Sequence, residues 1–377
     1  MGGGTKTPGG QKRAGFSPEW MVSQEWQVVT KLSEAVHVMV KTTGYLLIAC
    51  ALYICIFSCI YVASSVLLTR GIVLKYGLLR EFQKDFYINR GYRNIWHMQR
   101  DCIALDEKLI YIPKIGECRF RNPEFDTTLH FEEAGRYRNR MPSFTSEIGI
   151  VVLGDSMAMG WGVNDHECFA NIIQDELQTP VYNLAVSSYG TVRELLRLQQ
   201  SGLINKIDTI LIQYSANDLI ENTSIDKESA FLEAKTNYQE ALTGVKPIGD
   251  GNVLRSIRRA FSFAIEKPVR HFRDLVLSTK KKDQFAPHYQ GLVTVLKKFA
   301  ALLDNKRVVV FDTDKDRFEG FPMGKDKTIG NVEFLDLELD INDHYIIDGH
   351  LNSAGHKNVG KALSRYLGKP YMGESVR

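Results

Sequence analysis

A long apolar stretch without charges is the feature that most constrains how this chain folds. No charged residue lies between Thr42 and Thr69, a range that contains GYLLIACALYICIFSCIYVASSVLL. The stretch exceeds the roughly 20 residues that an α-helix needs to cross a hydrocarbon core about 30 Å thick. A cleaved signal peptide is the competing interpretation, but its apolar core is shorter, roughly 7–15 residues, and lies nearer the N-terminus. We therefore expect a single-pass transmembrane helix over residues 42–69.

Basic residues flank both ends of this stretch. Two basic residues, Lys31 and Lys41, lie just before the stretch, and four lie just after it: Arg70, Lys75, Arg80 and Lys84. By the positive-inside rule this difference favours a cytoplasmic C-terminal side. The N-terminal tail adds Lys6, Lys12 and Arg13 to the basic residues on the N-terminal side, which favours the opposite orientation. Long domains also cross membranes largely regardless of such charges. The flanking charges alone therefore leave the orientation open.

Composition divides the chain into four parts. We expect a Gly-rich polar tail and a short helix over residues 1–41, and the span over residues 42–69. Residues 70–146 read as a helical stalk followed by a small accessory segment of short strands. Residues 147–370 form the main domain, which an insertion over residues 222–285 interrupts. The net charge of +3 is too small to indicate a nucleic-acid partner.

Strands and helices are predicted to alternate from residue 147 onward. Apolar runs predict strands over residues 148–153, 180–185, 208–214 and 307–312. Helical spacing predicts helices over residues 166–178, 191–201, 286–304 and 353–367. This alternation is typical of a three-layer α/β fold, in which helices cover both faces of a parallel sheet. Ligands of such folds bind beyond the C-terminal ends of the strands.

The insertion holds a basic segment over residues 251–282. Within it, Leu254, Ile257, Phe261 and Ile265 recur at helical spacing. A basic amphipathic helix of this kind can lie on an anionic membrane surface. It can also pack its apolar face on its own domain, which is the outcome that we expect here.

The six cysteines fall into two groups. Three lie in the apolar stretch, where a thiol behaves as a small apolar group: Cys50, Cys55 and Cys59. Cys168 falls in a predicted helix, and its pairing with His166 lacks the second ligand pair of a metal site. Cys102 and Cys118 could form a disulfide in an oxidising compartment, or stay as unpaired buried thiols.

Polar clusters follow the predicted strands and open the last helix. The first strand ends in GDS at Ser156, and the second leads into NLAVSSYGT from Asn183. The third leads into YSANDL, and DGHLNSAGH precedes the last helix from Asp348. Each cluster alone is an ordinary turn or helix cap. Together they supply the parts that acyl transfer requires.

A serine hydroxyl is a weak nucleophile that needs an adjacent base, and the base needs a third group to hold its tautomer. Ser156, His350 and Asp348 can fill these three roles. The oxyanion that develops needs preorganised donors. The candidates are the backbone N–H of Ser156, a backbone N–H in the turn over residues 187–190, and the side-chain amide of Asn217.

In this order and at these strand ends, the four clusters resemble those of the SGNH or GDSL-type hydrolases. The resemblance covers roughly residues 147–368 and implies a flavodoxin-like sheet. It also implies that Ser156 is the nucleophile, that Asp348 and His350 are the acid and the base, and that Asn217 is an oxyanion donor.

The sequence departs from that family pattern in three places. Ser188 stands where such proteins usually have the glycine whose N–H binds the oxyanion, and Gly190 is the fallback for this role. Ser215 replaces a glycine of the third cluster, which leaves Asn217 intact. The acid and the base are one residue closer than in the usual Asp-x-x-His. We associate this variant with envelope-attached members that act on acyl groups of polysaccharides.

Other polar residues near the clusters are expected to have structural roles. His356 lies inside the last predicted helix and His344 lies upstream of the acid, so we expect His350 to be the base. Asp155 and Asp218 are expected to brace their loops rather than to react.

These residues predict a membrane-anchored serine esterase that removes O-acyl groups, such as acetyl, from saccharides. An O-acetyltransferase with the same triad and a glycan-binding scaffold without turnover are the alternatives. No cofactor or metal is expected, and the sequence indicates no protein partner. A saccharide ester substrate is expected outside the cytoplasm, and a disulfide also forms more readily there. We therefore expect residues 70–377 in the periplasm or its equivalent, with the N-terminus inside.

Overall fold

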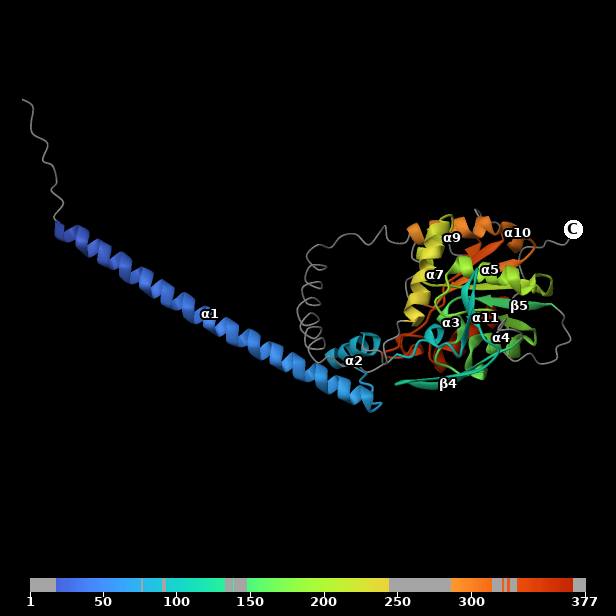
Figure 1. Cartoon of the computed structure of the whole chain (residues 1–377), viewed down its shortest axis with the longest axis horizontal. Helices are drawn as coiled ribbons and strands as arrows, with labels where there is room; N and C mark the ends of the chain where they lie inside the picture. The colour runs from blue at the N-terminus through green and yellow to red at the C-terminus, as the bar shows by residue number, and fades with distance from the viewer. Residues whose placement is uncertain are drawn as a thin grey trace, which may run out of the picture.

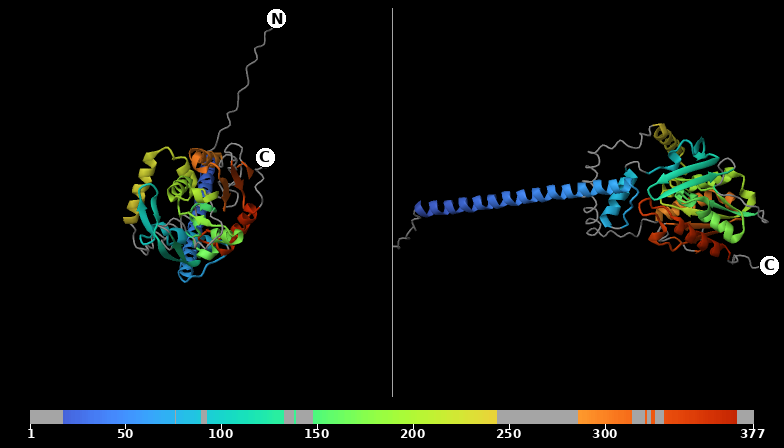
Figure 2. Two further views of the ribbon diagram at one scale, coloured as in Figure 1. Left: turned by 90° about the vertical axis from the view of Figure 1, so that its right-hand side faces the viewer. Right: turned by 90° about the horizontal axis from the view of Figure 1, so that it is seen from below.

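The computed structural model describes residues 18–75, 77–89, 93–132, 138, 148–243, 286–313, 321, 324–325 and 331–368. In this part of the chain, a long N-terminal helix leads into an α/β domain (Figures 1 and 2). The expected tail over residues 1–17 and the expected basic amphipathic helix over residues 251–282 lie outside the described residues.

Helix α1 (Pro18–Thr69) is continuous and extends away from the domain (Figure 1). The expected short helix before the span and the expected span are therefore parts of one element. Among the described residues, α1 is the one helix that is long and apolar enough to cross a membrane, over Val29–Thr69.

Helix α2 (Gly77–Asn89) follows α1 but does not continue it as the expected stalk. The chain turns at Gly71, whose φ of 75° is a left-handed conformation that suits glycine. The turn is then held by Gln83, whose Oε1 accepts the N–H of Leu74 and whose amide donates to the carbonyl of Ile72. As a result α2 packs beside the end of α1 (Figure 1).

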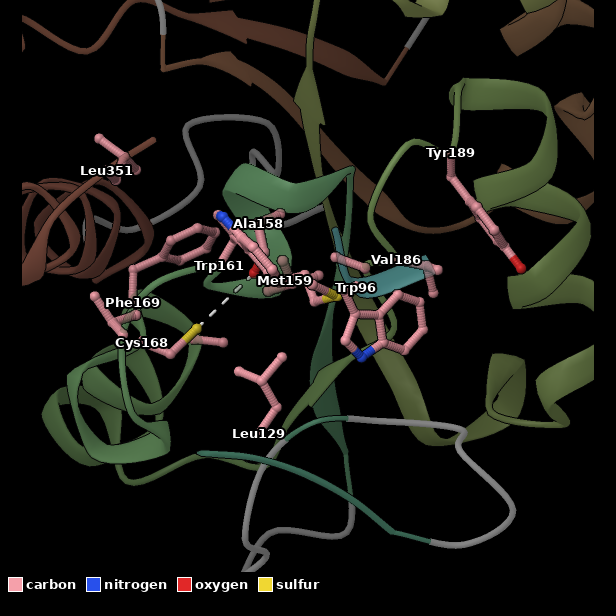
Figure 3. Close-up of a cluster of buried hydrophobic side chains, with 14 of the residues drawn as sticks. Trp96, Leu129, Ala158, Met159, Trp161, Cys168, Phe169, Val186, Tyr189 and Leu351 are labelled. Carbon is pink, nitrogen blue, oxygen red and sulfur yellow. Dashed lines mark hydrogen bonds between the residues drawn. The ribbon is translucent and has the colours of Figure 1, made fainter. Parts of the chain in front are cut away.

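The accessory segment, for which the sequence predicted short strands without their pairing, contains two antiparallel hairpins. They consist of β1 (Ile103–Asp106) with β2 (Ile110–Pro113), and β3 (Gly116–Asn122) with β4 (Phe125–Phe131). A disulfide joins Cys102 to Cys118, which is one of the two states that the sequence left open. Trp96 of the 3-10 turn η1 (Trp96–Met98) and Leu129 are fully buried in the core cluster of the α/β domain (Figure 3).

The α/β domain is built on a sheet of order β6-β5-β7-β8-β10-β9. Its parallel strands are β5 (Gly149–Leu153), β6 (Val181–Asn183), β7 (Ile207–Tyr214), β8 (Arg307–Asp312) and β10 (Val332–Leu335). Numbered along the domain, they stand in the order 2-1-3-4-5, which is the flavodoxin-like order and confirms the predicted fold class. The short β9 (Gly324–Lys325) is antiparallel to β10, and neither β9 nor β10 was predicted.

Side chains of the central strands alternate between two cores, one on each face of the sheet. Ile150 and Val152 of β5 pack with α4 (Phe169–Leu177) and α11 (Ser353–Leu367). Val151 and Leu153 pack with α5 (Thr191–Ser201) and α9 (Ala286–Lys298) on the other face. The three layers are therefore helices, sheet and helices, as predicted.

The helices differ from the prediction at their boundaries. The helix predicted over residues 286–304 is divided into α9 and α10 (Ala300–Leu303), and the one over residues 166–178 begins only at Phe169. Three further helices were not predicted: α3 (Ser156–Met159), α6 (Asp218–Asn222) and α7 (Glu228–Thr243). The helix α7 occupies the start of the region that was expected to be an insertion.

Candidate active site

Ser156 lies directly beyond the C-terminal end of β5. Gly154 connects the strand to the turn with a φ of 150°, and a Cβ at this position would lie 2.6 Å from that of Ala158. Asp155 caps α3, because its carboxylate accepts the N–H of Met157 at 2.9 Å. Ser156 is thus the first residue of α3, and its N–H has no acceptor within the helix.

The structure brings together the three residues that were predicted to form the triad. The Oγ of Ser156 lies 2.7 Å from the Nε2 of His350. The Nδ1 of His350 is hydrogen-bonded to the carboxylate of Asp348, two residues earlier in the chain. Gly349 lies between them with a φ of 82°, a left-handed conformation that folds the acid back onto the base.

The carboxylate of Asp348 has further partners that sequence reasoning missed. Its side chain is only 1% exposed, and its Oδ2 accepts the hydroxyl of Tyr87 in α2 at 2.5 Å. The Nε of Arg93 lies 3.5 Å from the same oxygen. Burial opposes ionisation, but His350, Arg93 and Tyr87 together lower the pKa of Asp348 to about 2. The acid is therefore a carboxylate at neutral pH.

Glu124, at the turn between β3 and β4, holds the backbone of the loop that carries Asp348. Its carboxylate accepts three successive N–H groups, those of Ile346, Ile347 and Asp348, at 2.7–3.0 Å. No local motif marks Glu124 in the sequence, because an acid beside a proline in a hairpin turn is ordinary. The accessory segment thus fixes the loop that presents the acid and the base.

Residues 93–98 run from the acid to the second strand-end cluster. Arg93 contacts Asp348, and His97 lies with its Nδ1 3.4 Å from the Oγ of Ser187. Burial, with the charges of Arg193 and Arg93, lowers the pKa of His97 to about 4. His97 is therefore neutral at pH 7.

The predicted oxyanion residues lie on the two neighbouring strand-end loops. Ser188 and Asn217 are exposed, and the amide of Asn217 donates to the carbonyl of Tyr189 at 3.2 Å. Ser188 has a φ of 62°, so this turn uses the left-handed conformation that favours glycine. Gly190 is buried at the start of α5, where a Cβ would lie 2.8 Å from the Cδ of Glu221, so close packing accounts for this glycine.

The remaining candidates have structural partners. His356 is fully buried, stacks on Phe169 and accepts its N–H, and burial lowers the pKa of His356 to about 3. His344 contacts the carbonyl oxygen of Thr313 through its Nε2. Asp218 accepts the N–H of Ser215 at 2.9 Å and so braces the loop that carries Asn217. The histidines take the structural roles that we expected.

Comparisons with known proteins identify one family. The model of the family GDSL-like Lipase/Acylhydrolase matches residues 150–363. No curated protein matches the chain. The structure is similar to those of three esterases, each at low identity.

The first is a psychrotrophic esterase from Pseudoalteromonas sp., with 14% identity, a TM-score of 0.31, and coverage of 58% of this chain and 98% of that chain. The second is a carbohydrate esterase family 2 enzyme with a carbohydrate-binding domain from Corynascus thermopiles, with 12% identity, a TM-score of 0.35, and coverage of 60% and 68%. The third is an acetyl xylan esterase from the rumen bacterium Butyrivibrio proteoclasticus, with 11% identity, a TM-score of 0.34, and coverage of 61% and 65%.

Proposed function

The chain belongs to the GDSL-like lipase/acylhydrolase family and is a serine hydrolase of that family, and from this premise we propose that it is a membrane-anchored esterase that removes O-acyl groups, such as acetyl, from saccharides. The observation that carries the proposal is the chain of hydrogen bonds from Ser156 through His350 to Asp348 at the C-terminal edge of the sheet. Residues 147–370 are the catalytic domain, and α1 is the anchor.

The reaction proceeds through an acyl-enzyme. The Oγ of Ser156 attacks the ester carbonyl while the Nε2 of His350 takes the hydroxyl proton. The C–O bond to the saccharide then breaks, and His350 gives the proton to the departing alkoxide. In the second half of the reaction water attacks the acyl-serine while His350 takes a proton from the water. The bond between the acyl carbon and the Oγ of Ser156 then breaks, His350 returns the proton to this oxygen, and the free acid leaves. Asp348 holds the tautomer of His350 throughout and stabilises its charged form.

The negative charge on the carbonyl oxygen needs donors that are in place before the reaction. The N–H of Ser156 and the N–H of Ser188 are two such donors, and the amide of Asn217 is the third. The structure supports this assignment because Ser188 and Asn217 are exposed on the two loops that follow β6 and β7. These strands are the neighbours of β5 in the sheet, so their loops flank Ser156 on both sides.

Two observations support a saccharide ester on the outer side of a membrane. Ser188 and Asn217 are exposed and Ser156 is half-buried, so the site is open enough to admit an acyl group that is attached to a bulky carrier. The disulfide between Cys102 and Cys118 is of a kind that forms and persists in oxidising compartments. We therefore place the N-terminus inside and residues 70–377 in the periplasm or its equivalent.

The triad has a direct kinetic test. Ser156→Ala and His350→Ala should each lower kcat for p-nitrophenyl acetate at least about 10³-fold, because nucleophile and base act as one unit. For the same reason the double variant should lose little more than either single variant. The exposed His166→Ala is the matched control and should keep wild-type kcat. Turnover by Ser156→Ala would contradict the mechanism.

The oxyanion role of Asn217 can be tested separately. Asn217→Ala removes one donor to the developing charge and should lower kcat by roughly 10²–10³-fold with a smaller effect on KM. Because Asn217 is exposed, the melting temperature should stay within a few degrees of that of the wild type. Asn217→Asp keeps the shape and removes the donor, so it should be as slow as Asn217→Ala. An unchanged kcat in both variants would remove Asn217 from the site.

The orientation in the membrane is tested by fusions after Arg377. Alkaline phosphatase is active only where its disulfides form, and green fluorescent protein serves as the complementary reporter of the cytoplasm. We expect an active phosphatase fusion and a dark fluorescent-protein fusion in a bacterial host. A fluorescent fusion together with an inactive phosphatase would reverse the orientation.

A further inference from the structure

The catalytic acid proposed above is held by residues that lie outside the α/β domain. The Oδ2 of Asp348 accepts the hydroxyl of Tyr87, which is 261 positions away in α2, and it forms an ion pair with Arg93 just after α2. The other carboxylate oxygen is occupied by His350. Removal of Tyr87 and Arg93 would therefore leave a buried, half-paired carboxylate, which is costly in an apolar environment.

Helix α2 is in turn fixed to the end of α1. Phe82 lies edge-on to Phe57 and to Tyr61 of α1, with ring centroids 5.7 Å apart in both pairs, and Phe86 also contacts Tyr61. Gln83 donates to backbone carbonyls on the α1 side of the turn. We call residues 57–89 the anchor hairpin.

The acid loop itself packs on the anchor hairpin. Ile347, which precedes Asp348, is fully buried in one apolar cluster with Tyr61 and Leu68 of α1 and with aromatic residues of α2. Figure 1 shows α2 and the end of α1 on the side of the domain where α3 lies, and Ser156 is the first residue of α3. The contact therefore joins the reactive edge of the domain to the anchor.

This contact lies at the edge of the membrane. A hydrocarbon core about 30 Å thick takes about 20 of the residues between positions 42 and 69, so the outer end of the span falls between about residue 61 and residue 69. Tyr61 and Leu68, the buried α1 residues that share this cluster with Ile347, come from this range. The acid loop is thus placed within a few residues of the lipid surface.

We propose that the anchor hairpin is part of the active site: Tyr87 of the hairpin and Arg93, which follows it, are positioning residues for Asp348, and the site works at the lipid surface on saccharide esters that a hydrocarbon chain holds in the membrane. The proposal rests on the esterase function proposed above and narrows its substrate. A site fixed at the lipid surface meets an ester carried in the membrane at high effective concentration and with a restricted orientation.

The charges around Asp348 predict the direction in which the pH dependence of activity changes when a positioning residue is removed. Among the described residues, the charged and titratable groups that interact with Asp348 are Tyr87, Arg93, Glu124, Tyr345 and His350. Donation from Tyr87 and the charge of Arg93 both disperse the negative charge that Asp348 presents to His350. Without either group, the carboxylate of Asp348 stabilises the imidazolium more strongly relative to the neutral imidazole. His344 and His356, which also lie near His350, are unchanged in such variants.

The first experiment measures kcat/KM against pH for the full chain in detergent, with p-nitrophenyl acetate. The acid limb reports where activity is lost because the base of the free enzyme takes up a proton. In Tyr87→Phe we expect this limb to move to higher pH by about 0.5–1 unit and kcat to fall several-fold. Arg93→Met should move it in the same direction, and Arg93→Lys should restore it. Tyr366→Phe is the matched control, because it loses a similar 2.5 Å bond to the carboxylate of Glu333, and this bond does not involve Asp348 or His350.

Two results separate the possible failures. Wild-type acid limbs in both Tyr87→Phe and Arg93→Met would overturn the positioning role, even if Ser156→Ala is inactive. An active Ser156→Ala variant would instead overturn the proposed function on which this inference rests. A shift in Tyr366→Phe equal to that in Tyr87→Phe would also overturn the positioning role, because it would show a general effect of losing a tyrosine hydroxyl.

The second experiment tests action at the lipid surface. The full chain in phosphatidylcholine vesicles is given 6-O-acetyl dodecyl glucoside, which inserts in the bilayer, or 6-O-acetyl methyl glucoside, which stays in water. A variant with a 20-residue Gly-Ser linker after Gly71 keeps the domain tethered to the same membrane, with a mean reach of about 25 Å. Phe82→Ala and Phe86→Ala in the same variant remove the ring contacts that hold α2 on α1. We expect the ratio of dodecyl to methyl turnover to fall at least about tenfold in the linker variant. An unchanged ratio would overturn action at the lipid surface, because tethering alone would then explain any preference.

Discussion

The buried carboxylate of Asp348 is the constraint on which the arrangement of the molecule depends. A side chain that is 1% exposed keeps its charge only where donors and cations surround it. Its partners are His350 in the α/β domain, Tyr87 in α2, and Arg93 in the segment that follows α2. Tyr87 and Arg93 are distant in sequence from Asp348, so their two contacts form only where α2 and the segment after it meet the loop of Asp348.

The accessory segment holds the backbone of the loop that carries Asp348. The carboxylate of Glu124 accepts the N–H groups that the acid loop would otherwise leave unpaired. The same hairpin packs Phe120 and Phe125 against Trp161, which lies just after α3. The segment before the α/β domain therefore supports both the loop of Asp348 and the turn that follows Ser156, which we propose as the acid and the nucleophile.

The sequence predicted the sheet, its layers and the meeting of Ser156 with His350 because their signals are local. Apolar runs define strands, and polar residues at the ends of parallel strands come together at one edge. Tyr87, Arg93 and Glu124 carry no such signal, because a tyrosine in an amphipathic helix or an acid in a turn is ordinary. The stalk was expected because the apolar spacing continues past Gly71, and spacing does not show that a helix reverses direction. The short β10 was missed for a related reason, since four residues are too few to show a period.

The turn at Ser188 and the loop of Asp348 are fixed by separate parts of the structure. The guanidinium of Arg193 in α5 donates a hydrogen bond to the carbonyl of Ser188 and forms an ion pair with Glu221 in α6. Glu221 also packs against Gly190. These charged side chains of α5 and α6 therefore hold the turn at Ser188 in its left-handed conformation. Such a conformation costs of the order of 1 kcal/mol in a residue other than glycine and persists only where its surroundings impose it. The acid is held instead by the anchor hairpin and Glu124. Because these supports share no residue, displacement of the anchor hairpin would loosen the proposed acid and base and leave the proposed oxyanion donor at Ser188 in place.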